Sequence, residues 1–380
     1  MTDDKKKESN VVEIKKHLPP ENYKGSKQLD LFSLFLKNKN EELTNTIEFW
    51  DSIPKYILNK EQQKKLRPKE GQPDPYEYEY TKNGYEYKVI TQPALIKQDD
   101  GSYKAFFPSV TEELIEEVLK KFLSEQNALG IHEEKKGNTW VKFTIFAIQK
   151  ELNKKNKKVI GEDGVIKEKG KSRSYKEIKQ SLEILSKSII TVKRNNVIIW
   201  NSPILEAFSM SDSEQYKKES ERLSIAKLSS HISNAIDNIE YRQANYLLLM
   251  GLNTSLSRWL YRKMIFKVTN SPDSDSSKKI SVIKGHHKKP YNLAYSTIKK
   301  ESGLLQAKEE HKNRAKMIEA LEELKREKVI YEYKLKEHKE GRTIKDVIYY
   351  FEHDFDFGKE QKRANKRQTI LIKKSKKDED

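Results

Sequence analysis

The chain has 380 residues, which suggests roughly two or three domains, and its formal net charge at pH 7 is +17. A field of this sign attracts polyanions, so nucleic acid is the first class of partner to consider. The chain has no cysteine, which excludes disulfide frameworks and thiolate metal sites, and it has no apolar run long enough to span a membrane. We therefore expect a cytoplasmic protein with no membrane partner.

Residues 1–75 predict a flexible arm followed by a tether. Residues 1–25 are rich in lysine and glutamate, so burial could not offset the entropy of ordering them. An apolar island follows, and its first five residues are Gln28, Leu29, Asp30, Leu31 and Phe32. Two interpretations of this island are open: a short peptide that docks in a partner's groove, or a short amphipathic helix that folds on its own domain.

Residues 76–142 predict the scaffold of a first domain. Tyrosines alternate with other residues on both sides of Asn83-Gly84, which is a strong hairpin signal. A second hairpin is predicted to turn at residues 99–101. Ser109 and the glutamate three residues after it form a capping box, which predicts the start of a helix.

Residues 143–187 predict two helices in succession. The first, over residues 143–152, has its apolar residues at helical spacing and would support the second. A polar insertion at residues 153–170, with a basic loop at its start, separates the two. Ser174 then opens a capping box, so the second helix should begin at Tyr175, with one apolar stripe and one basic face.

A basic hairpin is predicted directly after the second helix. Residues 189–192 and 197–200 are mostly β-branched, and Asn195 and Asn196 between them tolerate positive φ. A helix followed by a basic hairpin indicates a winged helix, in which the helix enters the major groove of DNA and the wing holds phosphates. An ordinary solvated basic face is the alternative. The predicted DNA-binding residues of this unit are Ser172, Arg173, Ser174, Tyr175, Lys176, Lys179, Gln180, Lys193 and Arg194.

The second half of the chain repeats this order without repeating the sequence. Helices are predicted at residues 291–302 and 308–328, and strands at 330–335 and 347–351 flank a basic loop. The predicted DNA-binding residues here are Lys312, Asn313, Arg314, Lys316 and Arg342. The predicted fold is therefore α+β with two tandem winged-helix domains: an N-terminal arm (1–75), a first domain (76–270), a linker or exposed loop (271–290), a second domain (291–360) and a basic tail (361–380).

The sequence carries no pattern typical of an enzyme. It has neither a phosphate-binding GxxxxGK[ST] loop nor an HExxH zinc motif. His286 and His287 lack the spacer residue that metal-binding histidine pairs of DNA-nicking enzymes usually have. We expect no catalytic residue, no cofactor and no metal, and an enzyme acting on DNA ends or nicks remains the alternative from another functional class.

Five segments in the same order make the chain resemble the TrfA family of plasmid replication initiators. They are FWDSIPKYIL (49–58), SRSYKEIKQSLEILS (172–186), YRQANYLLLM (241–250), LSRWLYRKM (256–264) and STIKKESGLL (296–305), and the resemblance runs from about residue 28 to residue 357. The QLDLF segment at residues 28–32 is similar to the peptide by which bacterial proteins dock on the sliding clamp. The chain departs from the family in its lysine content and in polar inserts at residues 153–170 and 270–290.

The resemblance implies a non-enzymatic initiator that binds repeated sites, or iterons, in double-stranded DNA at a plasmid origin in a bacterial cytoplasm. Such a protein opens the adjacent duplex and recruits the host sliding clamp, helicase and initiator proteins. Single-stranded DNA of the opened origin and a second copy of the chain, as a homodimer, are further candidate partners. The alternative is a winged-helix transcriptional regulator, which would bind an inverted repeat as a two-fold dimer and would have no use for QLDLF.

Overall fold

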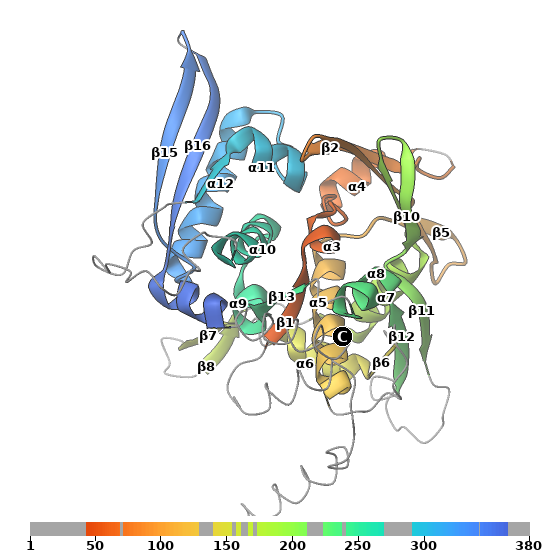
Figure 1. Cartoon of the computed structure of the whole chain (residues 1–380). Helices are drawn as coiled ribbons and strands as arrows, with labels where there is room; N and C mark the ends of the chain where they lie inside the picture. Colours follow the sequence, from red (N-terminus) through yellow and green to blue (C-terminus); the bar gives the residue numbers. More distant parts are fainter. Residues whose placement is uncertain are drawn as a thin grey trace, which may run out of the picture.

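The computed structural model describes residues 43–68, 71–128, 140–153, 157–160, 166–169, 173–210, 223–237, 241–269, 291–341 and 343–363. These residues form a mixed α+β structure, as the sequence predicts (Figure 1). Several predictions fall outside the described residues, namely those for the peptide at 28–32, for Ser172, for the linker at 271–290, for Arg342 and for residues 364–380 of the tail. No described helix is both long and apolar enough to cross a membrane.

Three helices form the centre of the first half of the chain. They are α5 (Val110–Ala128), α6 (Ile145–Asn153) and α7 (Tyr175–Lys187), and each contacts the other two. Their apolar stripes meet in the first core cluster, where Ile148, Ile178 and Leu182 are fully buried. The helical spacing of the apolar residues therefore identified the buried faces correctly.

The capping boxes lie where the sequence places them. The Ser174 hydroxyl accepts a hydrogen bond from the Glu177 backbone N–H at 3.2 Å, and the Glu177 carboxylate accepts one from the Ser174 backbone N–H at 2.8 Å. At the start of α5, the Glu112 carboxylate accepts from the Ser109 N–H at 2.8 Å. Both helices begin at the predicted residue because these side chains satisfy backbone groups that have no partner within the helix.

A four-stranded antiparallel sheet flanks these helices, with the order β10-β9-β3-β2. Its strands are β2 (Tyr76–Lys82), β3 (Tyr85–Thr91), β9 (Ile189–Arg194) and β10 (Val197–Pro203). Asn195 and Asn196 have φ angles of 47° and 64°, and Asn83 and Gly84 also have positive φ, so both predicted turns are confirmed. The β9–β10 hairpin is not a free wing, because β9 also pairs with β3. The sequence did not show this pairing, since the two strands are about 100 residues apart.

Shorter sheets and helices complete the first half. The strand pairs are β1 (Leu43–Ile47) with β13 (Tyr241–Asn245), β4 (Ala94–Lys97) with β5 (Tyr103–Phe106), and β7 (Lys157–Ile160) with β8 (Ile166–Lys169), while β6 (Trp140–Phe143), β11 (Leu205–Met210) and β12 (Ser224–Leu228) form a three-stranded sheet. The helices are α3 (Glu48–Ser52), α4 (Lys60–Leu66) and α8 (Ser230–Asp237). Residues 157 and 158, which were predicted to lie in a basic loop, instead belong to β7. The predicted tether packs on the first half, because its Trp50 is fully buried in the first core cluster.

The second half is built on two helices, a strand, two further helices and a long hairpin. Its elements are α9 (Tyr246–Gly251), α10 (Ser255–Thr269), β14 (Tyr291–Ala294), α11 (Tyr295–Ser302), α12 (Glu310–Arg326), β15 (Ile330–Glu340) and β16 (Thr343–His353), and the strands have the order β14-β16-β15. The basic loop predicted between strands at 330–335 and 347–351 is wrong. Both strands continue almost to Gly341. Backbone pairing extends the hairpin without apolar side chains, and ion pairs such as Lys345–Glu340, at 2.9 Å, accompany it.

The second core cluster contains the apolar side chains of α10, including Leu260, Met264 and Ile265. They pack with Met317 and Leu321 of α12. α10 thus shares its core with the elements after residue 290, whereas the sequence analysis placed it with those before residue 270.

Candidate nucleic-acid interface

The outer side of α7 carries three of the predicted DNA-binding residues. Lys176 is exposed, and Lys179 and Gln180 are half-buried, whereas Tyr175 packs against the first core cluster. The Lys176 ammonium lies 2.5 Å from the Asp99 carboxylate at the tip of the β4–β5 hairpin, and both side chains are more than three-quarters exposed. An exposed pair of this kind contributes little stability, so Lys176 can exchange Asp99 for a phosphate at small cost.

A cleft of about 490 Å³ lies between α4, the start of α5 and α7. Arg173 and Gln180 line its α7 side, and Lys60, Lys64 and Arg67 line its α4 side. Burial lowers the pKa of the Arg173 guanidinium, and the nearby carboxylates of α5 and α7 oppose this effect. The lining has four basic side chains against two carboxylates, those of Glu112 and Glu177, so the cleft is a cationic surface beside the exposed side of α7.

The α4 lysines were missed by the sequence analysis, which treated residues 1–75 as arm and tether. Asn59 and Gln62 form a full capping box at the start of α4, and Gln63 binds both the N–H and the C=O of Phe107. The pattern N-x-x-Q followed by KKLRPK was a usable signal of a short basic helix. This anchoring holds Lys60 and Lys64 at the mouth of the cleft.

The tip of the β9–β10 hairpin holds the two predicted wing residues. The Arg194 guanidinium lies 5.2 Å from the centre of the Tyr85 ring, and Lys193 is paired in register with Lys88 of β3. The Asn195 N–H donates to the Glu86 carbonyl at 2.9 Å, and the Glu86 N–H donates to the Asn195 side chain at 3.1 Å. The cationic tip is therefore held by the neighbouring β2–β3 hairpin.

Asn313 of α12 is not available to DNA. Its side chain is fully buried, accepts from the Ala307 N–H at 2.8 Å and donates to the Ala307 carbonyl at 2.9 Å. The amide thus closes the loop before α12 by pairing both backbone groups of one residue. Asn313 was predicted to share a DNA-binding face with Lys312 and Lys316, but its side chain lies on the core side of α12. Helical spacing alone did not show which side of this helix faces the core.

The other predicted residues of α12 lie at its first two turns. Lys312 pairs with Glu309 at 2.9 Å, and both side chains are more than half exposed. Lys316 is exposed, and Arg314 is half-buried with its guanidinium 6.0 Å from the centre of the Tyr295 ring. Lys312 and Lys316 are one turn apart, so they form a short basic face.

The β15–β16 hairpin extends away from the body of the molecule beside α11 and α12 (Figure 1). Lysines and one histidine are exposed along it: Lys334, Lys336, His338, Lys339 and Lys345. Strands with charged side chains on an exposed edge resist edge-to-edge aggregation and can also contact phosphates. The hairpin is longer than the sequence predicts, and its lysines are balanced by acids on the same strands, two of which pair with Lys339 and Lys345.

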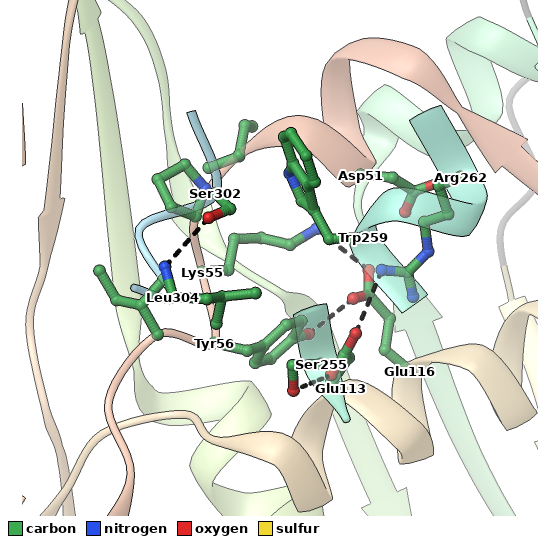
Figure 2. Close-up of a pocket in the computed structure, with 13 residues that line it drawn as sticks. Asp51, Lys55, Tyr56, Glu113, Glu116, Ser255, Trp259, Arg262, Ser302 and Leu304 are labelled. Atoms are coloured by element: carbon green, nitrogen blue, oxygen red, sulfur yellow. Dashed lines mark hydrogen bonds and ion pairs between the residues drawn. The ribbon is translucent and has the colours of Figure 1, made fainter. Parts of the chain in front are cut away.

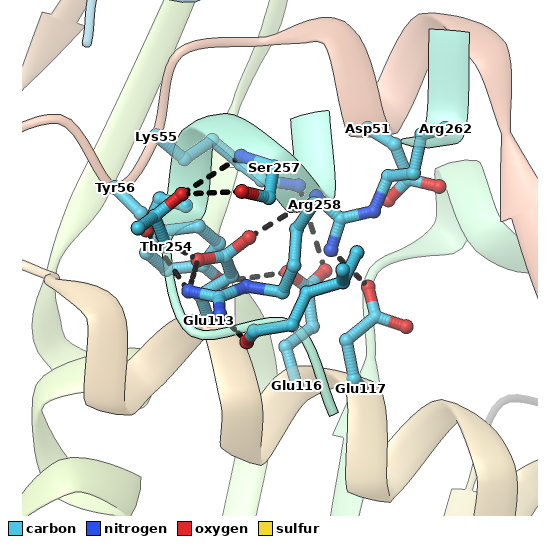
Figure 3. Close-up of polar contacts among 12 residues, drawn as sticks. Asp51, Lys55, Tyr56, Glu113, Glu116, Glu117, Thr254, Ser257, Arg258 and Arg262 are labelled. Carbon is cyan, nitrogen blue, oxygen red and sulfur yellow. Dashed lines mark hydrogen bonds and ion pairs between the residues drawn. The ribbon is translucent and has the colours of Figure 1, made fainter. Parts of the chain in front are cut away.

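Eight charged side chains are buried where α3, α5 and α10 meet, and Figure 3 labels all of them except Lys120. We call them the buried charge network: Asp51, Lys55, Glu113, Glu116, Glu117, Lys120, Arg258 and Arg262. None of these side chains is more than 10% exposed. The four acids balance the four bases, as burial of charges requires.

The network shifts the pKa values of its members. Burial would raise the pKa of Glu113, but the charges of Arg258 and Arg262 lower it to about 2. Burial lowers the pKa of Lys55 to about 8, although Glu116 opposes this shift. Burial also raises the pKa of Glu117, against the charges of Lys120 and Arg262.

The cavity beside the network is too small for a substrate. Its volume is about 40 Å³, and Lys55, Tyr56, Trp259 and Leu304 are among the residues around it (Figure 2). A space of this size holds one or two waters at most. Within the described ranges, no three histidine, aspartate or glutamate side chains are grouped so that they could hold a metal ion. The buried charge network therefore has a structural role, which is to connect the two halves of the chain.

No family model and no curated protein matches the chain. Two solved structures are similar to it. The crystal structure of RctB domains 2-3 is 12% identical, covers 77% of this chain and 96% of its own, and gives a TM-score of 0.41. The crystal structure of the Pi initiator protein in complex with iteron DNA is 15% identical, covers 64% of this chain and 94% of its own, and gives a TM-score of 0.38. At TM-scores below 0.5 this likeness does not establish a shared fold, so function is inferred below from the chain's own residues.

Proposed function

We propose that this chain is a replication initiator that binds repeated sites in double-stranded DNA through two winged-helix units. The observation that carries the proposal is the presence, in one chain, of two helices with exposed lysines, each followed directly by a β-hairpin. The first unit consists of α5, α6, α7 and the β9–β10 hairpin, and the second of α10, β14, α11, α12 and the β15–β16 hairpin. In the second unit, the strand order β14-β16-β15 is the one expected for a winged helix.

Each unit offers a helix for the major groove and cations for the backbone. α7 presents Lys176, Lys179 and Gln180, and α12 presents Lys312 and Lys316. A glutamine can form two hydrogen bonds with adenine, whereas lysines contact guanine or phosphate. If each helix occupies one groove, the two units cover about 20 bp, or two helical turns.

Opening of the origin and recruitment of host proteins belong to the same proposal. The sequence has no ATP-binding phosphate loop, so duplex opening would use binding energy or a partner's ATPase. The peptide at residues 28–32 would dock on the sliding clamp, and the helicase and the host initiator would bind elsewhere. In this proposal the protein is not an enzyme, and incubation with supercoiled DNA and Mg²⁺ should give neither nicking nor a covalent adduct.

Selection of bound fragments from plasmid and genomic DNA at physiological salt, followed by footprinting, tests the proposal. We expect tandem direct repeats beside an A·T-rich stretch, because a monomer with two different units reads a site without two-fold symmetry. A lone inverted repeat near a promoter would favour a transcriptional regulator instead. Binding without any sequence preference would contradict both.

A further inference from the structure

We propose that the buried charge network fixes the placement of α7 relative to α12, and that Arg258 and Arg262 are thereby determinants of the spacing between the two halves of the DNA site. This inference rests on the proposed function, since it presupposes that both units bind the same duplex. It goes further by assigning a specificity role to side chains that never touch DNA.

Arg258 joins α10 to α5. Its guanidinium lies 2.8 Å from the Glu113 carboxylate of α5 and donates at 2.8 Å to the Leu252 carbonyl at the end of α9, so it joins α10 to α5 and to the segment before α10 (Figure 3). The Ser255 hydroxyl donates to the same carboxylate at 2.9 Å. The Arg258 side chain is fully buried, so water cannot replace these partners.

Arg262 fixes the register of the two helices. Its two terminal nitrogens bind carboxylates one turn apart on α5, Glu113 at 3.1 Å and Glu117 at 2.8 Å. A guanidinium is planar and its N–H groups point in fixed directions, so a slide of one helix along the other would break at least one of these bonds. An apolar contact of the same area would tolerate such a slide, because hydrophobic burial is not directional.

The network extends to α3, which packs against both helices. Lys120 of α5 lies 3.0 Å from Asp51 of α3 and 2.7 Å from Glu117. Glu116 accepts hydrogen bonds from the Trp50 indole and, at 2.6 Å, from the Tyr56 hydroxyl. Removing one member therefore leaves another charge buried without a partner, which is strongly unfavourable.

The helices that carry the buried charge network pack against both proposed DNA-binding helices. α5 contacts α7, and α10 contacts α12, so the network links α7 to α12 through two packed helices. A second point of contact lies away from the network: the Tyr78 hydroxyl donates to the Lys300 carbonyl at 2.7 Å, and the Gln62 amide donates to Gln306 at 2.7 Å. Two separate points of attachment resist rotation of one half about the other.

The test uses the full chain and a selected site whose two halves are separated by zero, one or two added base pairs. One added base pair moves one half by about 3.4 Å and turns it by about 34°. We expect the wild-type affinity to fall by about tenfold or more for one added base pair, which is within the range of a single mismatch. For Glu113→Gln/Arg258→Met, which leaves the net charge unchanged, we expect a fall of about threefold or less.

Glu206→Gln/Lys227→Gln is the matched control. This pair lies 2.7 Å apart on β11 and β12, is not a member of the buried charge network, and its removal also leaves the net charge unchanged. The control should show the wild-type dependence on spacing. Arg262→Lys keeps the positive charge but loses the guanidinium that binds two carboxylates at once. One added base pair should lower its affinity by an amount between those of the wild type and the double variant. This variant decides the test if the double variant does not fold.

A distance measurement gives a readout that does not depend on DNA. Because the chain has no cysteine, Lys187→Cys on α7 and Glu319→Cys on α12 place spin labels at two exposed positions only. We expect one narrow distance distribution for the otherwise wild-type chain and a broader one when Arg262→Lys is added. The inference would be overturned if Arg262→Lys changed neither the width of the distance distribution nor the dependence of DNA affinity on the spacing. Absence of any sequence-specific binding by the wild-type protein would instead overturn the proposed function itself.

Discussion

Glu113 of α5 and Arg258 of α10 form an ion pair of 2.8 Å in which neither side chain is more than 5% exposed. The charges of Arg258 and Arg262 hold the pKa of Glu113 at about 2, below its ordinary value of 4.5. The native state therefore gains stability from this ionised carboxylate at every pH above about 4.5. That contribution is lost progressively as the pH falls from 4.5 to 2.

Replacement of the Glu113 carboxylate should show how much of the protein's stability depends on its ionised form. We expect wild type to be more stable than Glu113→Gln at pH 7, and the difference in the free energy of unfolding to shrink by on the order of 3 kcal/mol between pH 5 and pH 2. Urea unfolding at a series of pH values measures it. Glu61→Gln, which removes an exposed pair with Lys64, is the control, and a difference that stays constant with pH would contradict the prediction.

The lysines of the α4 cleft should contact phosphates. We expect Lys60→Gln/Lys64→Gln to weaken binding to all DNA sequences alike and to lower the slope of log affinity against log salt by about 2, one for each lost contact. Fluorescence anisotropy at several salt concentrations measures both effects. Lys65→Gln, on the same helix but outside the cleft, should leave the slope unchanged. An equal loss in Lys65→Gln would show only a general charge effect.

Gln180 should read a base. We expect Gln180→Ala to lower affinity for the selected site by about tenfold, to leave affinity for unrelated DNA unchanged, and to relax the preference at one position. Selection from a randomised site shows the change. Lys193→Gln offers the contrast, because loss of a phosphate contact weakens all sequences equally. An unchanged selected sequence in Gln180→Ala would remove this residue from the reading face.

Asn313 should matter for stability and not for DNA sequence. Asn313→Ala leaves two partly buried backbone groups of Ala307 without their side-chain partner, which costs on the order of 1 kcal/mol. Thermal and urea unfolding should detect the loss, while the selected DNA sequence should stay the same. Lys312→Ala, its exposed neighbour, should be close to wild type in stability. A changed base preference in a folded Asn313→Ala protein would restore the original prediction.

The clamp-binding hypothesis has its own test. We expect Leu31→Ala/Phe32→Ala to abolish capture of the full chain by an immobilised bacterial sliding clamp, because these side chains would be the apolar anchors of the peptide. DNA binding should remain at the wild-type level. Leu34→Ala/Phe35→Ala, just beyond the five-residue motif, serves as the control. Equal capture by both double variants would assign the contact to another part of the chain.

Local signals in the sequence predicted the local structure well. The start of α7 at Tyr175 and the positive φ angles of Asn195 and Asn196 depend on a few neighbouring residues, so short patterns determine them. The buried faces of α5, α6 and α7 followed from helical spacing for the same reason.

Long-range relationships could not be predicted in this way. The pairing of β9 with β3 and the packing of α10 in the second core join residues distant in the chain, and no local pattern specifies them. The buried charge network shows the limit most clearly. EELIEEVLKK is typical of a charged, solvated helix face, yet its charges are buried because separate segments supply their partners. Arg262 of α10 pairs with Glu113 and Glu117, and Asp51 of α3 pairs with Lys120.

The pairing of β1 with β13 has a consequence for the order in which the molecule folds. Leu43 lies opposite Asn245, so this ladder closes a loop that contains most of the first core. Closing so long a loop is entropically expensive until the intervening chain is compact. We therefore expect β1 and β13 to join late, after the helices and hairpins on either side of them have formed. The residues of β1 and β13 would then be among the last in the first half to acquire native structure.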